Sequence, residues 1–286
     1  MRYIERDPPP ALSPFVRCVW LLEDERTQGE MERVLPDGCL DVVVEYGQPM
    51  ERVLPAGGAG AAGRSIVAGQ LHSAMQLRSV GPIGMLGVRF EPWAAGAFLR
   101  ETAGQLTDEV TTLDSVWGPM ARELEERIAE APDDETRMRL LTDEVERQFM
   151  PPGETGHALR EAVRLISEHH GDISVAEIAR RLQWSRRRLE RHFASAVGLS
   201  PKTLCRIERF QRVVQDLGAA EHTSARTSGR TGLAGLALDA GYADQAHMAR
   251  DFKRLAGLSV TSYLAEQHVL SDCFTVGSGQ PDHPAP

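Results

Sequence analysis

The stretch ISVAEIARRLQWSRRRLERHFASAVGLS, residues 173–200, is repeated in outline by LAGLALDAGYADQAHMARDFKRLAGLS, residues 233–259. Ile178 aligns with Leu236 and, after a gap of one residue in the turn, Phe193 aligns with Phe252. Each copy predicts a short helix, a tight turn and a second helix, which is the plan of a helix-turn-helix. The repeat therefore decides the fold of the C-terminal part of the chain.

The first copy carries the signals that begin and end helices. Ser174 is a predicted N-cap with a glutamate three residues later, and Ser185 is predicted to cap the second helix. Leu189 and Phe193 then follow at helical spacing and are expected to face inward. Gly198 ends the helix with a residue that tolerates the left-handed conformation.

Four arginines crowd the start of this second helix. At 100° per residue, Arg187 and Arg191 project opposite the inner face, Arg188 lies on the flank and Arg186 lies in the first turn. A guanidinium group can bind O6 and N7 of guanine in the major groove. The alternative is a solvated surface helix with an Arg186–Glu190 ion pair. The duplication favours a tandem DNA-reading device.

The second copy is less basic. Its second helix keeps an apolar inner face, and its outward residues include Ala246, Arg250, Lys253 and Arg254. Gln245 and His247 lie near the helix start, the end by which such helices enter the groove. Glutamine can bind adenine, and a small alanine can contact a thymine methyl group. For His247, a capping role and a phosphate contact carry equal weight.

A third helix is expected between the copies. Pro201 is well suited to a first helical turn, and the helical pattern continues to Leu217. An apolar stripe along it predicts one buried face, so this helix can hold the two units at a fixed separation. Arg206, Arg209 and Arg212 lie along it as candidate phosphate contacts, with a solvated basic face as an equal alternative.

Together these residues resemble the DNA-binding domain of the AraC/XylS family of bacterial transcription regulators, from His157 to about Gln267. The specific features are GLSP at residues 198–201 and AGYADQAHMARDFK at residues 240–253. The resemblance implies that the two second helices enter successive major-groove segments on one face of DNA. Its implied base-reading residues are Arg187, Glu190 and Arg191 in the first unit, with Gln245, Ala246, Ala249 and Arg250 in the second. Our candidate phosphate contacts are Arg186, Arg188, Arg206, Arg209, Arg212, His247, Lys253 and Arg254.

Three departures from that family pattern concern the second unit. The Gly-, Ser- and Thr-rich loop at residues 218–232 is longer than usual, and we expect it to be mobile. Val260 stands where the family usually has proline, and Leu236 and Leu238 depart from the pattern of the preceding helix. We therefore expect the second unit to be less regular and the first unit to supply most of the affinity.

The charge of the chain is partitioned between its two parts. The whole chain has a formal net charge of −9, which by itself disfavours nucleic acid. Residues 157–268, however, hold 17 Lys and Arg against 12 Asp and Glu, while the remainder holds 15 against 29. This pattern predicts a basic DNA-binding domain joined to an acidic partner domain, with salt-sensitive binding.

Composition favours a cytoplasmic protein. No long apolar run could span a membrane, the first residues do not begin a signal peptide, and we expect no membrane partner. The four cysteines are scattered without a CxxC motif, as in a reducing compartment. We expect an α+β protein with an N-terminal domain at 1–150, a linker at 151–156, the DNA-binding domain at 157–268 and a disordered tail at 269–286.

The first 150 residues predict a β-sandwich or barrel, cupin-like, with appended helices. Expected strands are 16–22, 32–35, 40–45, 65–68, 74–80 and 84–90, with Pro36-Asp37-Gly38 as a hairpin turn. Expected helices are 92–102, 113–130 and 134–150. The last is amphipathic and is either a dimerisation face or a helix packed on its own sheet.

The stretches VLPDGCLD (34–41) and LGVRFEP (86–92) are similar to an uncharacterised cupin-like sensor domain often found in front of AraC-type domains. That resemblance implies a small-molecule effector, of unknown identity, and a homodimer. RNA polymerase is a further implied partner. We expect no catalysis, cofactor or metal. His72 is the only histidine before His157, and Cys18 and Cys39 are too few for a zinc-clustered repair site.

The sequence thus predicts a sequence-specific transcription regulator of AraC/XylS type. The alternative is a small-molecule-binding or protein-interaction protein whose helix-turn-helix no longer reads DNA specifically. A steep loss of affinity as salt rises would separate the two.

Overall fold

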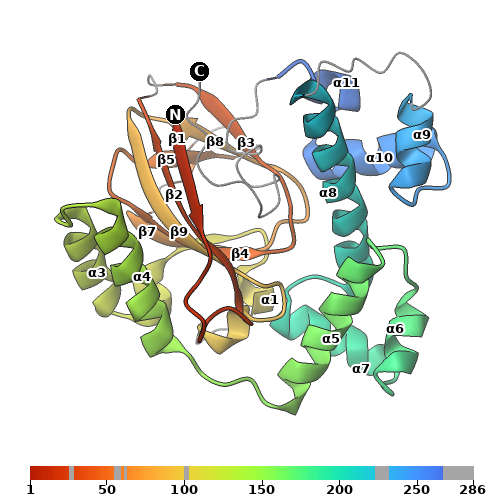
Figure 1. Cartoon of the computed structure of the whole chain (residues 1–286), viewed down its shortest axis with the longest axis horizontal. Coiled ribbons are helices and arrows are strands. Elements are labelled where there is room, and N and C mark those ends of the chain that lie inside the picture. The colour runs from red at the N-terminus through yellow and green to blue at the C-terminus, as the bar shows by residue number, and fades with distance from the viewer. Residues whose placement is uncertain (26–28, 55–58, 61–62, 100–102, 223–231, 267–286) are drawn as a thin grey trace.

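The computed structural model describes residues 1–25, 29–54, 59–60, 63–99, 103–222 and 232–266. Figure 1 shows an N-terminal domain of strands with helices at its side, and a C-terminal domain of helices alone. The predicted α+β class and its division into a β-rich and an all-α part are confirmed.

Two antiparallel sheets build the N-terminal domain. The larger sheet has the order β1 (Arg2–Arg6), β2 (Val16–Asp24), β9 (Ile83–Phe90), β4 (Leu40–Glu45), β7 (Ser65–Ala68) and β10 (Val110–Thr112). The smaller sheet has the order β3 (Met31–Val34), β8 (Met75–Ser79), β5 (Met50–Val53) and β6 (Ala59–Gly60). The sequence analysis missed β1, β5, β6 and β10, which are short or lie at sheet edges.

Both faces of the larger sheet are covered, so all eight residues of β9 are buried. Leu86, Val88 and Phe90 belong to a core shared with α2 (Leu113–Trp117), α3 (Met120–Ala129) and α4 (Asp134–Gln148). Met85 on the other face joins a core with side chains of the smaller sheet, such as Met50. This alternation is the period of two expected for a strand.

Three local predictions in this domain are wrong. The Pro36-Asp37-Gly38 turn does not close a hairpin, because β3 pairs with β8 whereas β4 pairs with β9 and β7. Of the helix expected at 92–102, the described residues 92–99 form only a 3₁₀ turn, Ala95–Ala97, and all of these residues except Gly96 are buried, without a single apolar stripe. The helix expected at 113–130 is broken between α2 and α3 at Gly118, which has a φ of +78°.

Helix α4 packs on its own sheet, so the dimerisation face proposed for its apolar side is wrong. Leu141 and Val145 are fully buried, and Met138 and Phe149 pack against the same core. All four residues pack within the same chain, so the apolar side of α4 is not available to a partner subunit.

The C-terminal domain follows the predicted plan. Its helices are α5 (Glu154–Glu168), α6 (Val175–Arg181), α7 (Arg186–Ala196), α8 (Pro201–His222), α9 (Leu233–Asp239), α10 (Gln245–Ala256) and α11 (Val260–Tyr263). We call α6 and α7 unit 1, and α9 and α10 unit 2. Figure 1 shows α8 running between them, with unit 1 near its start. Helix α5 begins inside the linker expected at 151–156.

The stripe predicted along the linking helix is buried and extends the core through both units. Leu204, Ile207 and Phe210 have no exposed surface, and the ring of Phe210 lies 5.2 Å from that of Phe252 in unit 2. Most of the loop expected to be mobile and the tail expected at 269–286 lie outside the described residues. None of the helices in the described ranges is long and apolar enough to cross a membrane.

Candidate nucleic-acid interface

Side-chain caps hold unit 1 in shape, as predicted. Ser174 Oγ accepts a hydrogen bond from the backbone N–H of Glu177 at 3.1 Å, and Ser185 Oγ accepts one from Arg188 at 3.2 Å. Each bond satisfies an N–H group that the helix itself leaves without a partner. The turn between the helices is tight enough to place Gln183 at a φ of +54°. These local contacts fix the direction in which α7 leaves the turn.

Helix α7 has one fully buried face and one bare basic face. Leu189 and Phe193 have no exposed surface, as their spacing predicts. Arg187 and Arg191 are exposed on the opposite side and make no hydrogen bond or ion pair with any residue in the described part of the chain. Two guanidinium groups one turn apart are thus available to a ligand outside the protein.

The neighbouring charged residues of α7 are partly engaged. Arg186 Nε lies 2.8 Å from Glu190 Oε1, and the guanidinium of Arg188 lies 4.4 Å from the ring centre of Trp184. The first contact is an exposed ion pair, which contributes little to stability and can exchange for a phosphate. Burial, followed by the charges of Arg191 and Arg188, lowers the pKa of His192.

Unit 2 repeats the arrangement with fewer charges. Asp244 accepts a hydrogen bond from the backbone N–H of His247 at 2.7 Å and so caps α10. Met248 and Phe252 are buried. Exposed along the other side are Gln245, Ala246, Ala249, Arg250, Lys253 and Arg254. An open hollow of about 580 Å³ lies beside this face, lined by Ala243, Asp244, His247, Arg250, Asp251 and Arg254.

His247 is half-buried rather than free at the surface. Its ring meets that of Tyr242 edge-on at 5.2 Å, and its Nε2 atom lies 3.8 Å from Asp251 Oδ2. These contacts are compatible with a capping role for His247 and equally with a phosphate contact.

Two arginines of the linking helix are used inside the protein. Arg206 binds Asp251 of α10, with Nη2 2.7 Å from Oδ1, and their side chains are only 18% and 12% exposed. Arg209 Nη1 donates to the carbonyl of Gly241 at 3.3 Å, and its guanidinium lies 5.2 Å from the ring centre of Tyr242. In this structure both residues join unit 2 to α8, and their role as phosphate contacts stays a prediction. Arg212 is half-buried.

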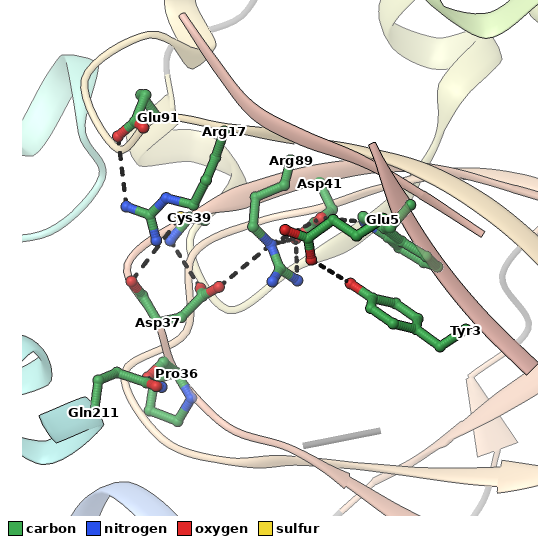
Figure 2. Close-up of polar contacts among 11 residues, drawn as sticks. Tyr3, Glu5, Arg17, Pro36, Asp37, Cys39, Asp41, Arg89, Glu91 and Gln211 are labelled. Carbon is green, nitrogen blue, oxygen red and sulfur yellow. Dashed lines mark hydrogen bonds and ion pairs between the residues drawn. The ribbon is translucent and has the colours of Figure 1, made fainter. Parts of the chain in front are cut away.

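A buried charge cluster in the N-terminal domain escaped the sequence analysis (Figure 2). Arg89 Nε lies 3.2 Å from Asp41 Oδ1 and 3.3 Å from Asp37 Oδ2. Trp20 Nε1 donates to Asp41 Oδ1 at 3.0 Å. Burial raises the pKa of Asp41, and Arg89 opposes that shift. Asp41 lies opposite Arg89 because of the register in which β4 pairs with β9. The sequence does not show which strands pair, so this cluster could not be predicted from it.

Two family models match the chain. Residues 178–266 match one described as a helix-turn-helix domain. Residues 4–112 match one described as a domain of unknown function, DUF6597. No curated protein matches the chain.

The solved structures that resemble this chain do so distantly. ToxT from Vibrio cholerae is 10% identical over 86% of this chain and 98% of its own, with a TM-score of 0.48. A structure of wild-type ToxT bound to an unsaturated fatty acid is 12% identical over 87% and 94% of the two chains, with a TM-score of 0.43. The AraC-like transcriptional activator CuxR is 16% identical over 75% and 85%, with a TM-score of 0.23.

Proposed function

The C-terminal domain of this chain is a helix-turn-helix domain of the AraC type, and from that premise we propose how this DNA-binding transcription regulator reads its site. Helix α7 enters one segment of the major groove with Arg187, Glu190 and Arg191. Helix α10 enters a second segment with Gln245, Ala246, Ala249 and Arg250. Arg186, Arg188, Lys253 and Arg254 bind phosphates at the edges of the two segments.

The observation that carries the proposal is the bare basic face of α7. Arg187 and Arg191 are exposed and without hydrogen-bond or ion-pair partners among the described residues, while the opposite face is packed without exposed surface. A helix so oriented presents its guanidinium groups at the depth of base edges when it lies in a groove. Helix α10 presents the equivalent positions of unit 2.

The packing of the two units on α8 suits this arrangement. Unit 2 contacts α8 at Arg206, Arg209 and Phe210, in the first half of this 22-residue helix. One helix and one shared core therefore hold both units, as two helices that enter neighbouring major-groove segments on one face of DNA require. A single chain then binds a site of two unequal segments, with more of the affinity from unit 1.

The N-terminal domain is proposed to bind a small-molecule effector. Its support is a group of buried polar side chains, among them Glu45 and Arg89, beside the apolar core between the two sheets, which an ordinary hydrophobic core would not contain. Glu45 Oε2 is buried there without a hydrogen-bond partner among the described residues. Thermal unfolding of the protein against a metabolite set tests the proposal, because a ligand of the native state raises the unfolding temperature.

The DNA proposal is tested by selecting binding sites from random duplex DNA with the purified protein. We expect one asymmetric site of two segments, with affinity that falls steeply as salt rises. Repeated inverted sites would indicate a dimer instead. Failure to enrich any sequence, or binding that is insensitive to salt, would favour the protein-interaction alternative.

A further inference from the structure

The N-terminal domain touches the C-terminal domain at the far ends of both groove-entering helices. Those ends are the left-handed glycines Gly198 after α7 and Gly257 after α10, each with a φ of +80°. Both lie at the opposite end of their helix from the residues that enter DNA first. The two contacts come from different parts of the N-terminal domain and involve backbone carbonyl groups in both cases.

At the end of α7 the contact is made by α1 (Ala103–Leu106) and the residue after it. Thr107 Oγ1 donates to the carbonyl of Gly198 at 2.9 Å. The fit is close, because a Cβ atom on Gly104 would lie 2.3 Å from the carbonyl oxygen of Ala194. One on Gly198 would lie 2.5 Å from Thr107 Oγ1 and 2.9 Å from Gln70 Oε1.

At the end of α10 the contact is made by the smaller sheet, through Arg33 of β3 and through Ala74, the residue before β8. Arg33 of β3 donates from Nη1 to the carbonyl of Ala256 at 3.1 Å. The backbone N–H of Ala74 donates to the carbonyl of Leu255 at 2.6 Å. A guanidinium group at a helix C-terminus is also favoured by the helix dipole. The side chain of Arg33 is only 13% exposed, so this contact is shielded from solvent.

A third contact joins the N-terminal domain to the linking helix α8, between the two contacts described above. Gln211 Nε2 donates to the carbonyl of Pro36 at 2.7 Å, as Figure 2 shows. A Cβ atom on Gly38 would lie 2.6 Å from Leu204 Cδ1. This is the 36–38 turn that crosses between the sheets instead of closing a hairpin, so its backbone is free to meet α8.

From these contacts we infer that the N-terminal domain sets the position of α7 relative to α10 by holding the C-terminal ends of both helices. Thr107 and Arg33 are then positioning residues for DNA recognition, which rests on the proposed function. All seven candidate base-reading residues are exposed with the N-terminal domain in place. The N-terminal domain therefore does not cover the DNA-binding face. It acts by setting the position of α7 relative to α10.

Small rotations at these ends have large effects at the DNA. Helix α7 has 11 residues and is about 16 Å long, so a tilt of about 10° at one end moves the other by about 3 Å. That displacement is close to the spacing of about 3.4 Å between successive bases along a strand. If either contact is lost, the distance between α7 and α10 should vary more. The protein should then bind DNA sites whose two segments are separated by different numbers of base pairs.

The first test needs no DNA. Spin labels at Arg187→Cys and Gln245→Cys, in a Cys273→Ser background, report the distance between the two helices; Cys18, Cys39 and Cys205 are buried. We expect one narrow distance distribution in the parent protein and a broader or shifted one after Thr107→Val with Arg33→Gln. Thr107→Ser alone, which keeps the hydroxyl donor, should leave the distribution narrow. An unchanged distribution in the double variant overturns the inference.

Two substitutions elsewhere in the N-terminal domain serve as matched controls. Thr111→Val and Arg78→Gln alter an exposed threonine hydroxyl and an exposed ion pair of the same domain, away from the two helix ends. Both should leave the distance distribution narrow. Circular dichroism of each variant checks that the helices remain, so a broadened distribution is not a loss of fold.

The second test uses the DNA site selected with the parent protein. Inserting one base pair between the segments should weaken the parent by about tenfold and the double variant by less than about threefold. Base preference within each segment should persist. An equal loss at every spacing would mean that the contacts only stabilise the protein, and this overturns the inference. If the parent selects no DNA, the proposed function fails, while the spin-label distances still decide the positioning.

Discussion

Arg206 of the linking helix binds Asp251 of α10 with two hydrogen bonds, 2.7 Å from Nη2 to Oδ1 and 3.2 Å from Nε to Oδ2. The paired geometry is the strong form of an arginine–carboxylate contact. Because the two residues come from different helices, the pair joins α10 to α8. An arginine that resembles a phosphate contact in the sequence thus serves to place unit 2.

Replacing Arg206 should test that role through stability. Arg206→Ala leaves the carboxylate of Asp251, 12% exposed, without its main partner and should lower the free energy of unfolding by about 2 kcal/mol. Urea unfolding measures the loss. Arg180→Ala breaks an exposed pair with Glu177 and, as the control, should cost less than about 1 kcal/mol. A shallower salt dependence of DNA binding with unchanged stability would restore Arg206 as a phosphate contact.

Arg191 should govern base preference in the segment read by α7. We expect Arg191→Ala to weaken binding to the selected site by about 1–3 kcal/mol and to relax preference at one position, because a bidentate contact with a base is lost. Binding titrations on the selected site and on single-base variants measure both effects. Arg164→Ala, on the surface of α5, is the control. A uniform loss on all sequences would assign Arg191 to a phosphate.

The end of α7 should tolerate no side chain. Gly198→Ala places a Cβ atom 2.5 Å from Thr107 Oγ1 and 2.9 Å from the carbonyl of Ala103, at a φ of +80°. Gly118 has a similar φ of +78° with nothing within 4 Å, so Gly118→Ala carries the backbone penalty alone. We expect a loss of about 1 kcal/mol for Gly118→Ala and at least about 2 kcal/mol for Gly198→Ala. Equal losses would contradict the close contact between the domains.

Glu45 should make stability fall as the pH rises toward neutrality. Burial raises its pKa from 4.5 to about 7 in the folded protein, against the smaller opposing effect of the Met50 N–H. The folded state then binds more protons than the unfolded state between these values, so its stabilising contribution is present below pH 4.5 and is lost as the pH passes 7. Urea unfolding of wild type and Glu45→Gln from pH 4.5 to 7.5 measures the difference. Parallel curves would show that Glu45 titrates normally.

The prediction of the C-terminal domain succeeded because its signals are local. The cap of Ser185 on Arg188 spans three residues, and Leu189 and Phe193 are one helical turn apart. Contacts at such separations depend on the helix alone and can be recognised from spacing. The exposed faces of α7 and α10 follow from the same periodicity. Their contacts with DNA stay predictions.

Sequence spacing could not show which side chains are engaged from elsewhere in the chain. Arg206 binds Asp251 across 45 residues, and Gln211 binds the carbonyl of Pro36 across 175. The turn was interpreted as a hairpin because proline and glycine mark a reversal but not the strand to which the chain returns. The apolar face of α4 offered two packing choices, and the sheet beneath it decided between them.

The sequence by itself determined the two helix-turn-helix units, their caps, the buried stripe of the linking helix and the exposed arginines of α7. Only the tertiary structure decided which arginines remain free, since Arg206 and Arg209 are used within the protein and Arg187 and Arg191 are not. Only the tertiary structure, too, joined Thr107 to Gly198 across 91 residues and Arg33 to Ala256 across 223. Helical periodicity and capping are encoded within a turn or two of backbone, whereas the partner of a charge or a carbonyl group depends on how the whole chain packs.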